Sequence, residues 1–476
     1  MPHRLTLAEM SRLIRKRKLS SAELVDAHWR QIERHNPQVN AFVMQFPSES
    51  RAEARRLDNE SWLGPLHGIP ITVKDSFDMR DLPTLCGSRM RLQHRAERTA
   101  TSVSRLREAG AIILGKTNCP EFLGNWETDN YITGRTNNPW NLDCTAGGSS
   151  GGESAAIAAF CSAGGIGSDG GGSIRVPAHF CGIAGLKPTP GRISAAGHFP
   201  EIGHPGGLLG VAGPMARTAE DVRILFNVLA GYDALDPFSA PTPLRTPDVD
   251  GVRVGVAETF CSVPVEEPIA KAVQTAASLL RHLGFATDAF APVGVERACE
   301  VWWFFFGELA APFNREITGL RPADAHWTGT ELLDMVPVDQ IISGRRVVEM
   351  LAIRDRMRAS LLEQMKQHRV LLMPACGVTA FRHRQRRWKI GNRSIGLLEA
   401  MAPVTPFNLM GFPAMVIPIE VNPEGMPVGV QLIGRPYEEE DLLELAVRIE
   451  STRGAFPPPP LPGMEESTHN TYSASK

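Results

Sequence analysis

The sequence predicts an α/β fold, in which a mostly parallel or mixed central β-sheet carries helices on both faces. Helical and strand patterns alternate along the chain: a helix predicted over 102–108 precedes a strand over 111–114, and a helix over 217–230 precedes a strand over 251–257. Hydrophobic residues make up 43% of the 476 residues, which is ample for a large core. Length alone would ordinarily indicate two or three domains.

The N-terminal part begins with two predicted helices within residues 6–36. Ser20 caps the second helix, and Glu23 completes a capping box with it. Residues 64–75 form a turn and then an apolar strand that ends near Lys74. A helix is predicted over 151–162, and its N-terminus would direct a positive dipole end toward the preceding loop. Residues 197–214, which are rich in Gly, His and Pro, are predicted to be a loop.

The C-terminal part continues the alternation. After the strand over 251–257, a helix is predicted to extend to about residue 283, followed by a strand over 286–290. The remaining predicted elements are strands over 370–374, 414–421 and 428–433 and a last helix over 441–450. Four prolines at 457–460 and a polar end predict an extended and then disordered tail over 457–476.

A glycine- and serine-rich stretch over 145–190 is the most informative part of the chain. Gly165, Gly167 and Gly170 fit G-x-G-x-x-G, but the extended S-I-R-V and proline that follow leave no room for the crossover helix that a dinucleotide site needs. A P-loop is excluded because no Lys-Ser or Lys-Thr follows the glycines at the required spacing. Two Gly/Ser clusters flank an apolar run over 155–160, a layout that predicts two loops. Plain loop glycine explains one such cluster better than two. The remaining interpretation is an oxyanion site beside a nucleophilic serine, Ser173.

Two motifs in this stretch carry a family resemblance. G-G-S-S-G-G-E, followed by G-S-D-G-G-G-S-I-R-V-P-A-H-F-C-G-I-A-G-L-K-P-T, and the earlier G-I-P-I-T-V-K-D-S-F-D together resemble the amidase signature family. The resemblance extends over nearly the whole chain. It implies one large α/β domain over 1–456, with N-terminal helices in 1–60, a catalytic core at about 61–235 and a variable pocket region at about 290–400.

The resemblance also implies the catalytic residues. Ser173 would be the nucleophile, Ser149 a bridging serine after a cis peptide bond, and Lys74 the base. The N–H groups of Gly170, Gly171, Gly172 and Ser173 would form the oxyanion hole. Supporting roles fall to Ser150, Asp169 and Arg175.

Lys74 can serve as a base only in its neutral form, so it has to be desolvated. The apolar run over 69–73 predicts that it is buried. The alternative is an ion pair with Asp75 or Asp78.

The resemblance leads to an amidase that hydrolyses neutral, apolar or aryl amides, and also esters or carbamates, through an acyl-enzyme intermediate. The A-type subunits of glutaminyl-tRNA amidotransferases usually read S-L-D-Q-I-G-P in one segment, where this chain reads G-G-L-L-G-V-A-G-P-M-A-R-T. This difference favours the stand-alone, fatty-acid-amide-hydrolase-like branch. An amidotransferase A-type subunit is one alternative, and a non-catalytic scaffold of the same fold is another.

An aromatic cluster over 302–306 has two interpretations. It is a buried helix face, or it supplies one wall of an acyl or aryl pocket through Trp302, Phe305 and Phe306. Five residues are too few to cross a membrane. The basic stretch Arg382–Lys389 is predicted to be a solvated surface loop rather than a nucleic-acid site.

Composition argues against several functions. The net charge of −2 argues against nucleic-acid binding and membrane-surface binding, and no apolar run approaches a membrane span. None of the eight cysteines forms a C-x-x-C pair, so we expect no metal and free thiols in a reducing cytoplasm. His198, His204 and His383 lack metal-ligand spacing and stay unassigned. No cofactor is expected, and the resemblance suggests a homodimer.

Overall fold

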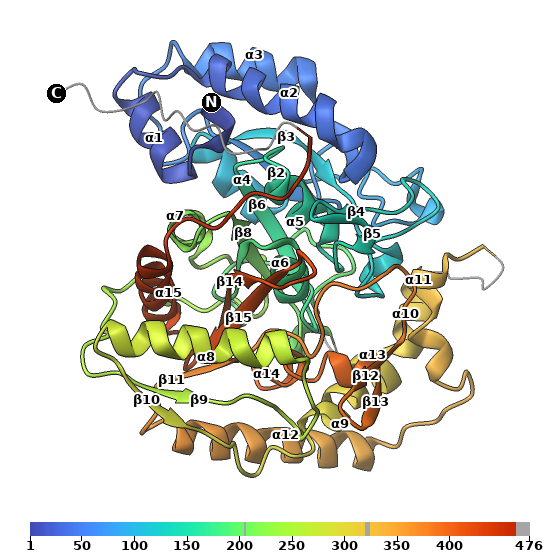
Figure 1. The fold of residues 1–476 in the computed structure, drawn as a ribbon. Helices are drawn as coiled ribbons and strands as arrows, with labels where there is room; N and C mark the ends of the chain where they lie inside the picture. Colours follow the sequence, from blue (N-terminus) through green and yellow to red (C-terminus); the bar gives the residue numbers. More distant parts are fainter. Residues whose placement is uncertain (204–205, 319–323, 463–476) are drawn as a thin grey trace.

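A computed structural model describes residues 1–203, 206–318 and 324–462 (Figure 1). Among these residues, an 11-stranded sheet has the order β1-β3-β2-β6-β8-β7-β14-β15-β11-β9-β10. Its strands are β1 (Phe42–Gln45), β2 (Pro70–Lys74), β3 (Ile112–Thr117), β6 (Gly164–Asp169), β7 (Ala184–Lys187), β8 (Val211–Ala216), β9 (Arg253–Val256), β10 (Ala286–Ala289), β11 (Val370–Pro374), β14 (Ala414–Val421) and β15 (Pro427–Ile433). Two small hairpins are β4 (Asn137–Asn138) with β5 (Asn141–Thr145), and β12 (Arg387–Ile390) with β13 (Arg393–Gly396).

The large sheet is mixed. Neighbouring strands are parallel within β3-β2-β6 near one edge and within β11-β9-β10 at the other. The strands between these two groups, from β6 to β11, pair antiparallel, as do β1 and β3. The prediction of a central mixed sheet is therefore confirmed.

Helices surround the sheet. They are α1 (Leu7–Arg15), α2 (Ser21–Val39), α3 (Pro47–Leu57), α4 (Thr101–Glu108), α5 (Gly151–Ala158), α6 (Arg175–Cys181), α7 (Ala219–Leu229), α8 (Glu267–His282), α9 (Ala298–Trp303), α10 (Ala311–Thr318), α11 (Trp327–Thr330), α12 (Gly344–Gln364), α13 (Leu397–Ala400), α14 (Thr405–Leu409) and α15 (Glu439–Arg453). A π-helical segment, Phe304–Leu309, continues α9. In the described parts of the chain, no helix combines the length and the apolar composition that crossing a membrane requires.

Helices cover both faces of the sheet, as predicted. Successive strand residues point to opposite faces, and they join different core clusters: Ile113 belongs to the cluster that includes residues of α7, α8 and α15, whereas Ile112 and Leu114 belong to the cluster that includes residues of α5 and α6. Met415 and Val416 of β14 divide in the same way. In Figure 1, α7 and α15 lie to the left of the central strands, and α8 crosses below them.

Two local predictions in the glycine-rich stretch were wrong. Residues 164–169 form the central strand β6 rather than a loop. Residues 175–181 form helix α6, although S-I-R-V was predicted to be extended. Pro177 is the third residue of α6, where the N–H that proline lacks would have no intrahelical acceptor. The capping box of Ser20 and Glu23 is confirmed, with Glu23 N–H donating to Ser20 Oγ at 3.1 Å.

Three further expectations need correction or restriction. The predicted loop over 197–214 ends earlier, because β8 begins at Val211. The basic stretch is not simply a solvated loop: Arg387–Lys389 belongs to β12, and Arg386 makes ion pairs with Glu127 and Glu331. His204 and most of the predicted tail, residues 463–476, lie outside the described residues.

Candidate active site

Two parallel strands bring the first functional groups together. Val73 of β2 lies opposite Ile166 of β6, so both strands end at the same edge of the sheet. Lys74 is the last residue of β2, and Ser168 stands next to the end of β6. Lys74 Nζ consequently lies 3.0 Å from Ser168 Oγ. Crevices at the carboxyl ends of strands are the usual ligand sites of α/β sheets.

The Lys74 amine is enclosed by hydroxyl groups. Its Nζ donates hydrogen bonds to Ser149 Oγ at 2.7 Å and to Ser150 Oγ at 3.0 Å. The side chain is fully buried, and this burial lowers the pKa of Lys74 to about 8. The alternative pairing with Asp75 does not form, because Asp75 Oδ1 lies 2.7 Å from Lys116 Nζ.

The Ser149 loop connects β5 to α5. Its Gly148–Ser149 peptide bond is cis, as the family resemblance implied. Gly148 has no room for a side chain, since a Cβ there would lie 2.6 Å from the carbonyl oxygen of Asn125. The N–H of Ser150 donates to the carbonyl oxygen of Ser173 at 3.1 Å. This bond fixes the Ser149 loop to the loop of the predicted nucleophile.

The loop from Gly170 to Ser173 is anchored on the carboxylate of Asp169. The N–H of Gly172 donates to Asp169 Oδ1 at 2.7 Å, and the N–H of Ile174 donates to Oδ2 at 3.1 Å. The Gly172 N–H, one of the four predicted oxyanion donors, is therefore already engaged. Gly172 has a φ of +104°, a conformation that favours glycine.

Arg175 holds this anchor in place. Its fully buried guanidinium binds Asp169 with an Nε–Oδ2 distance of 3.0 Å and donates to the carbonyl oxygen of Val404 at 2.9 Å. Asn408 Nδ2 donates to Asp169 Oδ1 at 2.9 Å. Burial alone would raise the pKa of Asp169, but the Arg175 charge and the hydrogen bonds from Arg175 and Asn408 hold it well below its usual range. Asp169 is thus an ionised anchor rather than a base.

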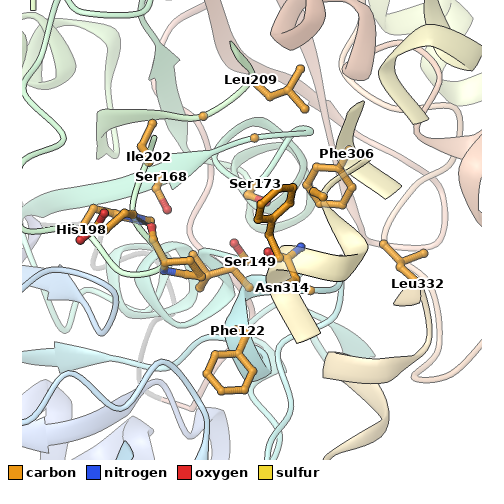
Figure 2. Close-up of a pocket in the computed structure, with 18 of the residues that line it drawn as sticks. Phe122, Ser149, Ser168, Ser173, His198, Ile202, Leu209, Phe306, Asn314 and Leu332 are labelled. Atoms are coloured by element: carbon orange, nitrogen blue, oxygen red, sulfur yellow. Dashed lines mark hydrogen bonds between the residues drawn. The ribbon is translucent and has the colours of Figure 1, made fainter. Parts of the chain in front are cut away.

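A cavity of about 260 Å³ opens above the serines (Figure 2). Ser149 and Ser173 lie at its centre, and Phe122, Phe306 and Leu332 stand around them (Figure 2). Most of the larger side chains that line it are apolar: Phe122, Leu123, Ile202, Leu209, Phe305, Phe306, Ala310, Phe313, Leu332 and Leu333.

Different residues of the aromatic cluster over 302–306 match the two interpretations, a pocket wall and a buried helix face. Phe305 and Phe306 line the cavity. Trp302 lies behind the nucleophile loop instead: its Nε1–H donates to the carbonyl oxygen of Gly170 at 3.1 Å. A Cβ on Gly171 would lie 2.5 Å from the Trp302 ring, so only glycine fits there. Trp302 therefore supports the loop, and Phe306 stacks on it with ring centroids 4.5 Å apart.

Sequence reasoning missed several residues of this site. Ser168 contacts Lys74 and lines the cavity, and its position one residue before Asp169 could have indicated it. Asn408 and Phe122 come from distant segments and carried no sequence signal. His198, which stayed unassigned, also lines the cavity; its Nδ1 donates to the carbonyl oxygen of Pro200 at 2.8 Å, and burial lowers its pKa to about 3. The imidazole is therefore neutral.

Comparison with known proteins shows the protein family to which the chain belongs. A family model described as Amidase matches residues 23–443. The chain is 34% identical to the A subunit of glutamyl-tRNA(Gln) amidotransferase from Roseiflexus castenholzii, over 93% of this chain and 94% of the relative.

Two solved structures are similar over almost their whole length. One is a chain from a vestigial protein complex that reveals the origins of an s-triazine catabolic enzyme, with a TM-score of 0.87 and 28% identity over 95% of this chain and 99% of that one. The other is a bacterial aryl acylamidase of the amidase signature enzymes, with a TM-score of 0.83 and 26% identity over 94% and 96%.

Proposed function

Because this chain belongs to the amidase family and is an amide hydrolase, we propose that it cleaves neutral, apolar or aryl amides through an acyl-enzyme on Ser173. One observation carries the proposal. A fully buried Lys74 amine lies 2.7 Å from Ser149 Oγ, and Ser149 and Ser173 share the floor of an apolar cavity. A desolvated amine beside two hydroxyl groups is the arrangement that can activate a serine nucleophile.

Proton transfer is the first step of the proposed mechanism. Neutral Lys74 accepts the proton of Ser149, which in turn takes the proton of Ser173, because a hydroxyl group both donates and accepts. Ser173 Oγ then attacks the substrate carbonyl. Ser150 and Ser168, both 3.0 Å from Lys74 Nζ, hold the resulting ammonium in place.

Backbone N–H groups stabilise the negative charge that forms on the carbonyl oxygen. We assign this role to Gly170, Gly171 and Ser173 and leave out Gly172, whose N–H binds Asp169. An oxyanion donor of this kind contributes on the order of 10²–10³ in rate. Arg175 and Asp169 position these groups without touching the substrate.

Collapse of the tetrahedral intermediate breaks the C–N bond. Ser149 gives its proton to the leaving amine and takes one back from the Lys74 ammonium, so that Lys74 is neutral again and the acyl group stays on Ser173. Water activated through the same Ser149–Lys74 pair then hydrolyses the acyl-enzyme. Esters and carbamates give the same kind of intermediate, so we include them among the substrates.

The cavity wall supports neutral and apolar substrates. Eight phenylalanine and leucine side chains line the wall, and its described residues include no Lys or Arg. Of its two carboxylates, Asp169 is neutralised by Arg175, and Glu201 is exposed to solvent. A substrate carboxylate would find no cation in this wall and would pay the cost of burying an unpaired charge.

A second candidate is an amidotransferase A-type subunit. The similarity to the Roseiflexus castenholzii glutamyl-tRNA(Gln) amidotransferase protein favours it. It requires glutaminase activity and a stable heteromeric partner, whereas the first candidate requires neither. A homodimer located in the cytoplasm remains our expectation for the stand-alone enzyme, and light scattering of the purified chain measures its mass in solution.

Labelling with a fluorophosphonate tests the proposal. We expect one adduct, mapped to Ser173 by mass spectrometry, and a labelling rate at least ~100-fold lower in Lys74→Ala, because the base is lost. Ser154→Ala is the matched control, since Ser154 is a buried serine of α5 bonded to backbone carbonyls. Labelling of another serine, or equal rates in Lys74→Ala and the wild type, would contradict the assignment. A fully unreactive Ser173 would favour the non-catalytic scaffold.

A further inference from the structure

Two cysteines outside the active site form a close pair. Cys261 Sγ and Cys299 Sγ lie 3.2 Å apart, and both residues are partly exposed, whereas the other six cysteines are buried. We propose that Cys261 and Cys299 form a reactive dithiol site that a hydroperoxide oxidises to a disulfide, and that this oxidation slows the chemistry at Ser173. The dithiol site stands on its own geometry, and only the effect on rate rests on the proposed function.

The fold brings these cysteines together from separate elements. Cys261 follows β9 in a turn where it and Ser262 have φ values of +54° and +56°, which non-glycine residues adopt rarely. Cys299 is the second residue of α9. The chain therefore places one thiol on a loop and the other on the helix that leads into the cavity wall.

The surroundings of Cys299 favour its thiolate form. The hydrogen bond with Cys261 lowers the pKa of Cys299, and a hydrogen bond with Thr405 acts in the same direction. Burial raises this pKa but does not outweigh the two hydrogen bonds. A thiolate with partial exposure is the form of cysteine that reacts with peroxides. Cys261 keeps its proton and serves as the resolving thiol.

The oxidation balances with a hydroperoxide as the named oxidant. The Cys299 thiolate attacks one peroxide oxygen and breaks the O–O bond, giving a sulfenic acid and, after protonation, one molecule of water or alcohol. Cys261 Sγ then attacks the sulfenic sulfur, the S–S bond forms, and the hydroxyl group leaves as water with the Cys261 proton. Both thiols lose one electron each, and the peroxide gains two.

Formation of the disulfide would shift Trp302, the side chain that lies behind the loop of Gly170 to Ser173. The sulfur–sulfur distance has to shorten from 3.2 Å to about 2.05 Å. Trp302 lies one helical turn after Cys299 on α9, and it contacts Gly170 and Gly171 through its indole N–H and its ring. A displacement of α9 is thereby transmitted to the proposed oxyanion donors. Misplacement by ~1 Å at a reacting centre costs up to about 100-fold in rate.

The test begins with chemistry that needs no substrate. The full-length chain is treated with a few equivalents of hydrogen peroxide, alkylated and mapped. We expect a mass loss of two hydrogens and a linked peptide pair containing Cys261 and Cys299, absent in Cys261→Ser and in Cys299→Ser. Cys144→Ser is the control, since Cys144 is buried and should leave the cross-link unchanged. No cross-link, or one between other cysteines, would overturn the dithiol site.

The second measurement concerns the effect on Ser173. We expect oxidation to lower the rate of fluorophosphonate labelling by on the order of 10-fold, and dithiothreitol to restore it. Cys261→Ser should label at the same rate before and after peroxide, with Cys261→Ala as a second variant if the first fails to fold. A mapped disulfide with an unchanged rate would overturn the coupling. A reduced protein that never labels would contradict the proposed function instead, while the cross-link still forms.

Discussion

Lys74 shows how the position of one residue in the fold changes its chemistry. Its carboxylate neighbour in sequence, Asp75, points to Lys116, and Lys74 is left among three serine hydroxyl groups. Without a directly paired carboxylate, burial outweighs the opposing effect of nearby groups such as Asp169 and Glu153 and lowers the pKa of Lys74 to about 8. A lysine that would ordinarily stay protonated thus has a much larger neutral fraction near physiological pH.

The pKa of Lys74 predicts how activity depends on pH. If the neutral amine is the base, kcat/KM should rise with pH, about 10-fold per unit below pH 8, and level off above about pH 9. The sign follows because deprotonation creates the active form. The measurement is kcat/KM for a neutral anilide between pH 6 and 10. His198→Gln should keep the rising limb, since the pKa of His198 is about 3. A flat profile would contradict Lys74 as the base.

At the scale of elements, the site depends on the close approach of α5 to β6. Gly165 of β6 faces the buried Glu153 of α5, and a Cβ there would lie 2.0 Å from Glu153 Oε1 and 2.3 Å from the carbonyl oxygen of Thr72. Gly167 is similarly close to Ser150, with a distance of 2.8 Å from such a Cβ to Oγ. Because Gly165 and Gly167 carry no side chains, α5 can lie directly against β6. This contact brings the loop of Ser149 and Ser150 close to Lys74.

Gly165→Ala tests this packing. We expect a loss of about 3 kcal/mol in the free energy of unfolding, because the new methyl group overlaps a backbone oxygen and a buried carboxylate. The measurement is the urea unfolding midpoint with an unchanged m-value. Gly344→Ala is the matched control: Gly344 begins α12, a Cβ there meets no atom within 4 Å, and stability should change by less than ~0.5 kcal/mol. Equal stability of the two variants would show that α5 can move away.

At the scale of the whole molecule, the cavity is assembled from segments that are distant in sequence. Phe122 and Leu123 follow β3, Ile202 follows the β7 region, and Phe305 and Phe306 continue α9. The proposed catalytic residues come from the end of β2 and from the loops before α5 and α6, and most of the apolar side chains around them come from segments outside the sheet. In the proposed mechanism, reaction chemistry and substrate selection therefore reside in different parts of the chain.

This division predicts selection against charged acyl groups by the chain acting alone. The matched substrates are an acyl anilide and the same anilide with a terminal carboxylate. We expect kcat/KM to be about 100-fold lower for the second, since burying an unpaired charge costs ~3 kcal/mol or more. Glutamine should be hydrolysed poorly for the same reason. Efficient glutamine hydrolysis, or activity that appears only with a heteromeric partner, would favour the amidotransferase candidate.

Two of the local predictions failed because contacts with other elements decided the outcome. The Gly/Ser cluster that includes residues 164–169 suggested a loop, yet these residues form β6, and the close approach of α5 leaves no room for a side chain at Gly165. Trp302 was considered either part of a buried helix face or part of a pocket wall, and its ring lies against Gly171 behind the loop instead of lining the cavity. Burial patterns report that a residue is enclosed and do not report which surface encloses it.

The sequence by itself determined the mixed α/β fold, the family and the positions that match its catalytic motif, because helix and strand periodicity and a long motif are local properties of the chain. Only the tertiary structure decided that Asp75 pairs with Lys116 and that the Gly172 N–H donates to Asp169. It also decided that Asn408 and Phe122 reach the site. These outcomes depend on contacts between residues far apart in sequence, and a local pattern carries no information on which of several possible partners lies nearest in space.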